Sequence, residues 1–596
     1  MKNSINAVEI WGGLECTINR VNDSYFDQLE YAGHYTRDED IGMISSLGIK
    51  TLRYPVLWER HQPEVDTDID WSGTEMKLHQ IRQSGMEVIA GLVHHGSGPR
   101  HVNFFDGSFE KGLADYARLV AEKFPWIHYY TPVNEPLTTA RFCGLYGHWY
   151  PHHCDELSFY KILLSECKAI VMAMQAIREI NSSAELIQTD DLGKCYSTPL
   201  LQYQAEYENE RRWLSYELIC GSLTPDHLMW KRLVKVGIHP EELYYFQSNN
   251  CRPAIAGFNY YITSERYLDE NIYKYDRQFH GGNGIHTYSD IEAVRVPLSV
   301  ENGPKLLIRE AWERLGIPIA ITECHLYSTR DEQMRWFCQM LDTAVALRKE
   351  GIDVRAVTAW AILGLYGWNR LVTQPWGDYE AGIFNVTGGQ VRPTALAAMI
   401  KMLAGGLPFQ HPVLETEGWW QRRIRLLSTC SDHFTDETEE RESACQPLLI
   451  LDESGTFTKA MGKICGDRNI RWISMDTRDM APEYASYELE IKRLNPWAVL
   501  HSPVDFTNPA LHEQKLAALA GLCGELDIRF LLWLSNEDFD AHENILAANP
   551  HALILYASSH PEQSFHLLHE ALNMLLDETT GVHYMESGTI LERASI

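Results

Sequence analysis

The stretch IHYYTPVNEP, residues 127–136, decides the fold because it joins a buried β-strand to a polar end. Its apolar and aromatic residues predict a strand, and Asn134 and Glu135 follow where that strand ends. A second run of this kind, PIAITEC at 318–324, carries Glu323 near its end. In a barrel of parallel strands the carboxyl ends meet on one face, where active sites lie. The two glutamates are therefore predicted to share one pocket.

Short buried runs alternate with longer helical patterns along the first 400 or so residues. In KGLADYARLVAEKF, residues 111–124, apolar side chains recur at helical spacing, which predicts one buried face. Eight strands alternating with helices are typical of an α/β fold, the (β/α)8 TIM barrel, and a doubly wound open sheet is the alternative. The six further strands are predicted at 7–13, 49–56, 86–93, 184–191, 254–261 and 354–362.

A chain of 596 residues is too long for one ordinary domain. We predict the barrel over 1–410, an acidic linker over 411–446 and a smaller Rossmann-like α/β domain over 447–596. The linker prediction depends on the acidic run DHFTDETEERE. The last domain is predicted from a strand–turn–helix pattern and several later buried runs, such as WAVLHS.

Composition excludes several classes of protein. With 45% hydrophobic and 22% charged residues the chain is globular, and a formal charge of -29 argues against nucleic acid or an anionic membrane as partner. No apolar run is long enough to span a membrane, and the first residues do not resemble a signal peptide. The 13 cysteines form no C-x-x-C pair, so we expect reduced thiols and a cytoplasmic location.

Two carboxylates in one pocket are what glycoside cleavage requires. One protonates the leaving oxygen, and the other attacks or stabilises the anomeric carbon. Their mutual repulsion can keep one of them protonated near neutral pH. The run CGLYGHWYPHHC, residues 143–154, contains zinc-ligand residue types, but its spacing matches no compact zinc pattern. We therefore predict no metal and no other cofactor.

Several motifs in this order resemble glycoside hydrolase family 1, the β-glucosidase family, over roughly residues 7–400. YTPVNEP resembles the family's T-x-N-E-P motif, and IAITEC matches I-T-E-N-G as far as its glutamate. EIWGG, TLRYPVLWER and GFNYY resemble further family motifs. The resemblance implies that Glu135 is the general acid/base and Glu323 the nucleophile. It also implies roles in sugar binding or in orienting the nucleophile for Asn134, His95, Arg53, Tyr261, Trp360, Asn19 and Trp368.

The chain departs from the family at positions that bind the sugar. The glutamate that clamps the glycone aligns with Gly367, and a tryptophan of the pocket aligns with Gly96. The Asn-Gly pair after the nucleophile is Cys324-His325, and the glutamine of the opening motif aligns with Asn19. Because polar contacts in a pocket discriminate strongly between substrates, these changes argue against ordinary glucosides.

The carboxyl-terminal unit resembles a shortened dTDP-4-dehydrorhamnose reductase-like domain. In LLILDESGTFTKA, residues 448–460, only Gly455 of three phosphate-loop glycines remains, and Asp452 and Thr458 stand at the other two positions. No Tyr-x-x-x-Lys pair occurs in this unit. The resemblance therefore implies a scaffold, or a surface for an oligomer or a protein partner, without a bound nucleotide.

The leading hypothesis is a retaining glycoside hydrolase or transglycosidase that acts on a small glycoside. Two alternatives remain open. One is a catalytically weak sugar-binding or scaffolding protein on the same barrel. The other is a sugar-nucleotide oxidoreductase that works through the carboxyl-terminal domain.

Overall fold

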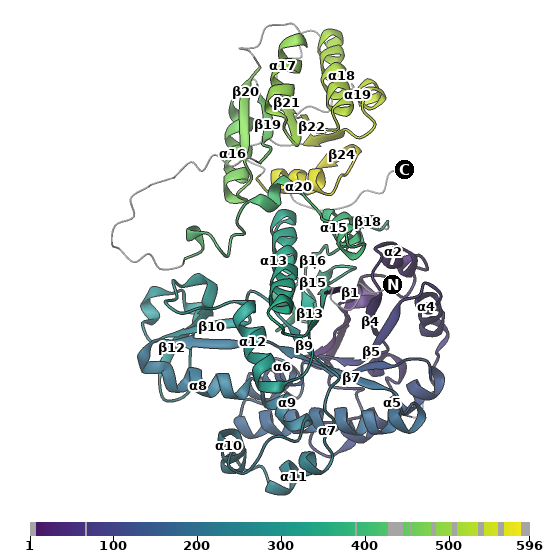
Figure 1. Ribbon diagram of the computed structural model, residues 1–596, viewed down its shortest axis with the longest axis vertical. Helices are drawn as coiled ribbons and strands as arrows, with labels where there is room; N and C mark the ends of the chain where they lie inside the picture. Colours follow the sequence, from purple (N-terminus) through teal and green to yellow (C-terminus); the bar gives the residue numbers. More distant parts are fainter. Residues whose placement is uncertain are drawn as a thin grey trace.

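The computed structural model describes residues 8–65, 68–387, 390–426, 445–452, 454–477, 484–503, 509–534, 542–557 and 565–585. Its larger part is a closed barrel of eight parallel strands in the order β1-β14-β13-β9-β7-β6-β5-β4 (Figure 1). All eight predicted strands are present, which confirms the TIM barrel. They are β1 (Glu9–Gly13), β4 (Thr51–Pro55), β5 (Glu87–His94), β6 (Tyr129–Asn134), β7 (Glu185–Asp191), β9 (Ile255–Asn259), β13 (Ile319–Cys324) and β14 (Val354–Ala359).

Helices surround the barrel and bury their apolar faces against it. The helix predicted at 111–124 is α5 (Ser108–Lys123), in which Leu113, Tyr116 and Val120 are fully buried. The other helices that follow the barrel strands are α2 (Asp40–Ser46), α4 (Ser72–Gln83), α7 (Glu156–Ile180), α9 (Leu214–Ile219), α12 (Pro304–Leu315), α13 (Arg330–Lys349) and α15 (Ala395–Ala404).

Insertions between the strands build a small side sheet in the order β11-β12-β10-β8. Its strands are β8 (Lys194–Ser197), β10 (Glu265–Asp269), β11 (His280–Gly282) and β12 (Thr287–Glu292). The same insertions hold α8 (Gln202–Arg211), α10 (Leu228–Val236) and α11 (Pro240–Ser248). Two hairpins near the mouth of the barrel pair β2 (Ile18–Val21) with β3 (Ser24–Asp27) and β15 (Leu365–Tyr366) with β16 (Tyr379–Glu380).

The carboxyl-terminal domain is a doubly wound parallel sheet in the order β20-β19-β21-β22-β23-β24, as predicted for a small α/β domain. Alternate residues of β19 face opposite layers, because Leu448 packs in the core shared with the barrel and Leu449 packs in a separate core. The strands are β19 (Leu448–Asp452), β20 (Trp472–Asp476), β21 (Ala498–Ser502), β22 (Arg529–Leu534), β23 (Leu553–Ala557) and β24 (Gly581–Met585). The helices are α16 (Thr456–Asp467), α17 (Tyr484–Leu494), α18 (Pro509–Glu525), α19 (His542–Ala548) and α20 (Phe565–Leu576).

Buried charges join the two domains at the first turns of α13. Asp331, which is fully buried, accepts from Nε of Arg468 at 2.8 Å and from Nη1 of Arg335 at 3.0 Å. Nearby, Trp420 packs edge-to-face on Trp336, with ring centroids 5.0 Å apart. The predicted linker is thus packed against α13 in its described part, 411–426, and the acidic run at 432–442 lies outside the described residues.

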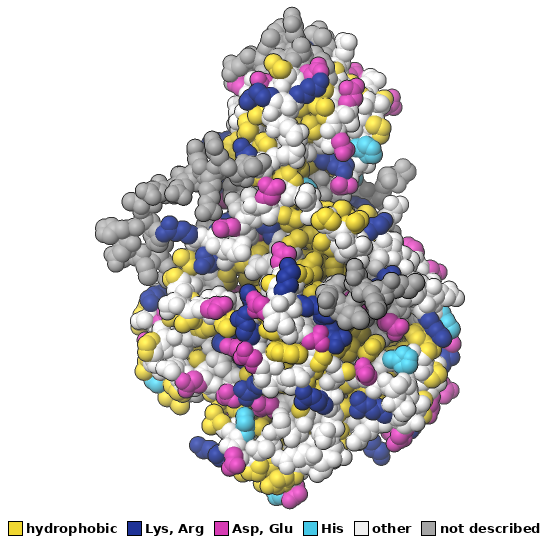
Figure 2. Space-filling model, in the orientation of Figure 1, with side chains coloured by type: hydrophobic (Ala, Val, Ile, Leu, Met, Phe, Trp, Pro, Cys, Tyr) yellow, Lys and Arg dark blue, Asp and Glu magenta, His cyan; other side chains and the backbone are white. Residues whose placement is uncertain are grey.

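The exposed surface carries charges of both signs, and Figure 2 shows acidic and basic side chains interspersed over the face that it presents. Within the described segments, no helix is both long and apolar enough to cross a membrane.

One buried acid gives the fold a testable pH dependence. Glu166 on α7 is fully buried, and neither carboxyl oxygen has a hydrogen-bond partner among the described residues. Burial raises the pKa of this carboxyl well above its usual range. The folded protein therefore keeps a proton that the unfolded chain releases, so stability is lost as the pH rises above the unfolded pKa.

We expect Glu166→Gln to remove this penalty. Its stability relative to the wild type should rise by up to about 1.4 kcal/mol for each pH unit between about pH 5 and pH 8. Unfolding temperatures measured across this range test the prediction, with Glu179→Gln, at an exposed position of the same helix, as the matched control. A difference between Glu166→Gln and wild type that does not change with pH would contradict it.

Candidate active site

The two glutamates lie at the carboxyl ends of strands on one face of the barrel. Glu135 directly follows β6 and Glu323 lies in β13, and both are buried, at 5% and 2% exposure. Glu135 has a φ of 48° and His95 a φ of 56°, a left-handed conformation that residues other than glycine rarely adopt. Strained backbone of this kind persists where the surrounding structure enforces it, and it clusters at functional sites.

Two donors hold the carboxylate of Glu323 from different strands. Arg53 Nη1 donates to Oε1 at 3.1 Å, and the Tyr261 hydroxyl donates to Oε2 at 2.5 Å. Arg53 also donates to the main-chain oxygen of Thr322 at 2.6 Å. Each oxygen of Glu323 therefore has its own donor, which fixes the plane of the carboxylate.

Asn134 connects Arg53 to two histidines. Its Oδ1 accepts from Arg53 Nη2 at 2.9 Å and from the Thr189 hydroxyl at 2.7 Å, so the opposite atom is the amide nitrogen. That nitrogen lies 3.2 Å from Nε2 of His94 and 3.4 Å from Nε2 of His95. Because the amide nitrogen donates, both histidine nitrogens must accept, which places the ring protons on Nδ1.

Glu135 has a neutral hydrogen-bond donor rather than a cation. Asn259 Nδ2 donates to its Oε1 at 2.6 Å, and His95 Nε2 lies 3.7 Å from Oε2. Burial lowers the pKa of His95 to about 4, so this ring is neutral. Asn259 was not among the predicted site residues, although it precedes Tyr260-Tyr261 in the same motif.

The remaining predicted residues surround these contacts. Trp360 stacks on His94, with ring centroids 5.6 Å apart, and Arg53 lies 4.9 Å from its ring centre. Trp368 is half-buried and meets His95 edge-to-face at 5.6 Å. Asn19 is fully buried and donates to the Leu371 oxygen at 3.0 Å, while its Oδ1 has no partner among the described residues.

The site also contains a third carboxylate that sequence reasoning missed. Glu15 is 3% exposed, and its Oε1 lies 3.8 Å from His94 Nε2, which in turn lies 3.9 Å from Oε1 of Glu323. The pKa of Glu323 is raised to about 8, because burial and the charges of Glu135 and Glu15 together outweigh the lowering effect of Arg53. Glu15 belongs to no recognisable motif, whereas His94 directly precedes the predicted His95 in VHHGSGP.

Two more acids at the end of β7 lie behind Glu135. Asp191 accepts from the Ser264 hydroxyl at 2.6 Å, and Asp190 accepts from the Ser215 hydroxyl at 2.5 Å. Burial raises the pKa of Asp191 to about 6 and that of Asp190 to about 8, with the charge of Glu135 adding to both. Burial also raises the pKa of Glu135 itself. The adjacent Asp-Asp sequence at the end of the strand predicted over 184–191 was the available signal.

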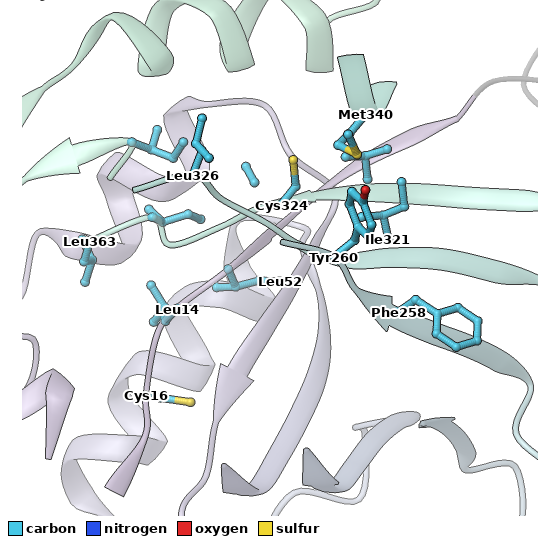
Figure 3. Close-up of a cluster of buried hydrophobic side chains, with 14 of the residues drawn as sticks. Leu14, Cys16, Leu52, Phe258, Tyr260, Ile321, Cys324, Leu326, Met340 and Leu363 are labelled. Atoms are coloured by element: carbon cyan, nitrogen blue, oxygen red, sulfur yellow. The ribbon is translucent and has the colours of Figure 1, made fainter. Parts of the chain in front are cut away.

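Two departures from the family pattern have structural reasons. A Cβ atom at Gly96 would lie 1.9 Å from Oε1 of Glu59, so this buried glutamate fills the space of a larger side chain. Cys324, the residue after Glu323, packs in the hydrophobic cluster with Ile321 and Met340 (Figure 3). Burial raises the pKa of its thiol well above the usual range, so it is unreactive.

A cavity of about 20 Å³, with room for about one water molecule, lies beside Arg53 and Asn134, and neither Glu135 nor Glu323 lines it. Its lining includes Arg53, His94, Asn134 and Trp360. Among the residues that the structure describes, no group of three or more His, Cys, Asp or Glu side chains could hold a metal ion.

In the carboxyl-terminal domain, an acidic side chain accepts from main-chain N–H groups at the start of the helix that follows the first strand. Helix N-termini at the end of a first strand bind phosphate through main-chain N–H groups in dinucleotide-binding folds. Here the Asp452 carboxylate accepts from the main-chain N–H groups of Ser454 at 3.0 Å and Thr458 at 2.8 Å. The protein's own anion therefore uses these donors.

Fold and site together define a TIM barrel with paired, buried carboxylates at the ends of its fourth and seventh strands. No protein-family model matches the chain. Beta-glucosidase 4 of Oryza sativa subsp. japonica is 21% identical over 420 residues, which cover 63% of this chain and 86% of that protein. Beta-glucosidase A of Thermotoga maritima is 25% identical over 155 residues, which cover 24% of this chain and 34% of that protein.

Solved structures show the same relationship. A family 1 β-glucosidase from Thermotoga maritima superposes with a TM-score of 0.54 at 14% identity, covering 67% of this chain and 98% of that chain. The AHE enzyme from Alicyclobacillus herbarius superposes with a TM-score of 0.52 at 16% identity, covering 63% and 87%. The barrel thus has the fold of the family 1 β-glucosidases.

The histidine tautomers can be tested without a substrate. Burial lowers the pKa of His94 well below its usual range and that of His95 to about 4. We expect neither ring to titrate between pH 5 and pH 8, and we expect both to carry the proton on Nδ1. Nitrogen-15 NMR of histidine-labelled protein, assigned with His94→Asn and His95→Asn, measures both properties. A titration midpoint near the ordinary value of about 6.5 for either ring would contradict the geometry.

Proposed function

We propose that this protein is a retaining glycoside hydrolase or transglycosidase that cleaves β-glycosidic bonds by double displacement. The observation that carries the proposal is the unequal setting of the two glutamates. A guanidinium and a hydroxyl hold Glu323, whereas a neutral amide holds Glu135. A cation beside a carboxylate favours the charged form, and burial without a cation favours the protonated form.

In this mechanism Glu323 attacks the anomeric carbon while Glu135 gives its proton to the leaving oxygen. The resulting glycosyl ester on Glu323 is then released by water or another acceptor, from which Glu135 removes a proton. Asn134 borders both glutamates through Arg53 and Asn259, so it is placed to bind the hydroxyl next to the anomeric carbon. No metal or nucleotide takes part in these steps.

The glycone is proposed to differ from plain glucose. The position of the family's clamping glutamate is Gly367, and the extra carboxylate Glu15 lies beside His94. Solved neighbours are the beta-glucosidase from Thermotoga maritima in complex with cyclophellitol and with deoxynojirimycin. We therefore propose a small glycoside as the ligand of this site. The 12 described free cysteines support the proposal of a reducing, cytoplasmic location.

A sugar-binding protein without turnover is the second candidate. The residue that aligns with the family's clamping glutamate is Gly367, and Glu15 brings a further buried carboxylate close to the pair. Both features favour a site that binds a sugar without cleaving it. The oxidoreductase alternative is disfavoured, because Asp452 uses the N–H groups that would bind a pyrophosphate.

Covalent labelling tests the proposed nucleophile. We expect an activated 2-fluoro glycoside from a panel of glycones to add one glycosyl mass to the protein, mapped to Glu323 by peptide mass spectrometry. The fluorine slows both steps, and the activated leaving group lets the ester accumulate. Glu323→Gln should remain unlabelled because an amide does not attack the anomeric carbon.

Glu30→Gln is a control at an exposed glutamate outside the proposed catalytic pair and should still be labelled. Labelling at another residue would contradict the assignment of Glu323. Sugar binding by calorimetry without any label across the panel would favour the second candidate.

The pH dependence of kcat/KM should reveal the effect of the third carboxylate, Glu15, on Glu323. Since Glu15 raises the pKa of Glu323, Glu15→Gln should lower that pKa and shift the acidic limb of kcat/KM to lower pH by about one unit. The limb itself should lie well above the usual glutamate range. The exposed Glu30→Gln should leave the profile in place. An unshifted limb in Glu15→Gln would contradict the proposed coupling.

A further inference from the structure

The carboxyl-terminal domain contacts the barrel where two active-site loops end. Residues 325–329 join β13, the strand of Glu323, to α13, and residues 360–394 join β14 to α15. In Figure 1, α20 of the carboxyl-terminal domain lies near the end of α13, the helix that the first of these loops enters. The second loop carries Trp360 and Trp368, so both loops border the proposed sugar site.

Asp577, which follows α20, links the starts of both barrel helices. Its Oδ1 lies 2.9 Å from Nε of Arg330, the first residue of α13, and accepts from the main-chain N–H of Ala395, the first residue of α15, at 2.7 Å. Arg330 Nη1 then donates to Gln333 Oε1 at 2.5 Å. Arg330 is 7% exposed and Gln333 is 4% exposed, so water does not screen these contacts.

From Gln333 the contacts continue to the nucleophile strand. Gln333 Nε2 donates to Glu380 Oε1 at 2.9 Å and to the main-chain oxygen of Leu326 at 3.1 Å. Oε2 of Glu380 lies 3.3 Å from His325 Nε2, and His325 Nδ1 donates to the main-chain oxygen of Trp360 at 3.2 Å. His325 is two residues from Glu323. Two links, Arg330 Nε with Asp577 and His325 Nε2 with Glu380 Oε2, are close contacts of charged or titratable groups without hydrogen-bond geometry, and hydrogen bonds make the other links from Asp577 to the main chain of Trp360.

Because of this path, the charge of Asp577 is expected to fix the two loops as well as to hold the two domains together. A surface ion pair would contribute little, but a buried guanidinium that loses its countercharge is strongly destabilising. Asn573 on α20 also accepts from the main-chain N–H of Arg330 at 3.4 Å and from Arg468 Nη2 at 2.9 Å, but it is neutral, so Asp577 is the residue of this domain that pairs with the charge of Arg330. Loss of the Asp577 charge should therefore disturb the two loops while the domains stay together.

We propose that the carboxyl-terminal domain is a positioning element for the barrel's active site, and that Asp577 acts through Arg330, Gln333 and Glu380 to hold His325 and the main chain of Trp360. The positioning role of this domain is argued from contacts alone, whereas its effect on catalysis rests on the proposed function.

Hydrogen exchange of the full-length protein tests the positioning part without any substrate. In Asp577→Asn, we expect amide exchange in residues 325–330 and 379–387 to be at least about tenfold faster than in wild type, while α5 stays unchanged. Glu578→Gln is the matched control, since Glu578 is exposed and pairs with Arg529 inside the same domain. Unchanged exchange in the loops, or equally faster exchange throughout the barrel, would overturn the proposal.

A double variant separates positioning from loss of folding. Arg330→Gln combined with Asp577→Asn removes both charges, so we expect loop exchange to return toward the wild-type rate. A double variant that exchanges at least as fast as Asp577→Asn would contradict a role for the pair.

The catalytic part is measured by the labelling reaction of Glu323. Asp577→Asn should lower the maximal labelling rate about tenfold and change the concentration for half-maximal rate less than about twofold, because the path reaches the strand of the nucleophile. An unchanged maximal rate together with faster loop exchange would reject the catalytic effect. Absence of labelling in the wild type would instead contradict the proposed function. The hydrogen-exchange result would still test the positioning role of Asp577 on its own.

Discussion

Arg53 lies at the centre of the barrel mouth, where it is 6% exposed and bonds to groups from two other strands. It donates to the carboxylate of Glu323, to the main-chain oxygen of Thr322 and to the side chain of Asn134. A buried guanidinium is stable only when its donors are satisfied, so these acceptors are held at fixed positions. Because Asn134 is fixed in this way, its amide nitrogen in turn orients His94 and His95.

The second constraint is an excess of carboxyl groups around that one cation. Glu15, Glu135 and Glu323 converge from three strand ends, and Asp190 and Asp191 lie behind them. Burial and mutual repulsion raise the pKa values of several of these groups, so the site holds protons that a solvent-exposed cluster would release. A proposed acid catalyst fits such a setting, because it must carry a proton before the bond breaks.

The barrel could be predicted because each strand is a buried apolar run between helical patterns, and strands β6 and β13 end in recognisable glutamate motifs. The segments TLRYPVLWER and GFNYY also placed Arg53 and Tyr261 near Glu323. Glu15 belongs to no motif and meets His94 only in three dimensions, and His94 was missed although it precedes the predicted His95. The contact of Asp577 with Arg330 depends on how two domains dock, and no local pattern encodes that.

The proposed double-displacement mechanism requires Glu135 as its acid/base. The most direct measurement is turnover of an activated β-glycoside by Glu135→Ala with and without azide, with the product analysed by proton NMR. We expect Glu135→Ala to turn over the substrate slowly and azide to accelerate this turnover, with a β-glycosyl azide as product. The small anion attacks the ester on Glu323 without needing a base. Failure of azide to accelerate turnover, or an α-glycosyl azide, would contradict this mechanism.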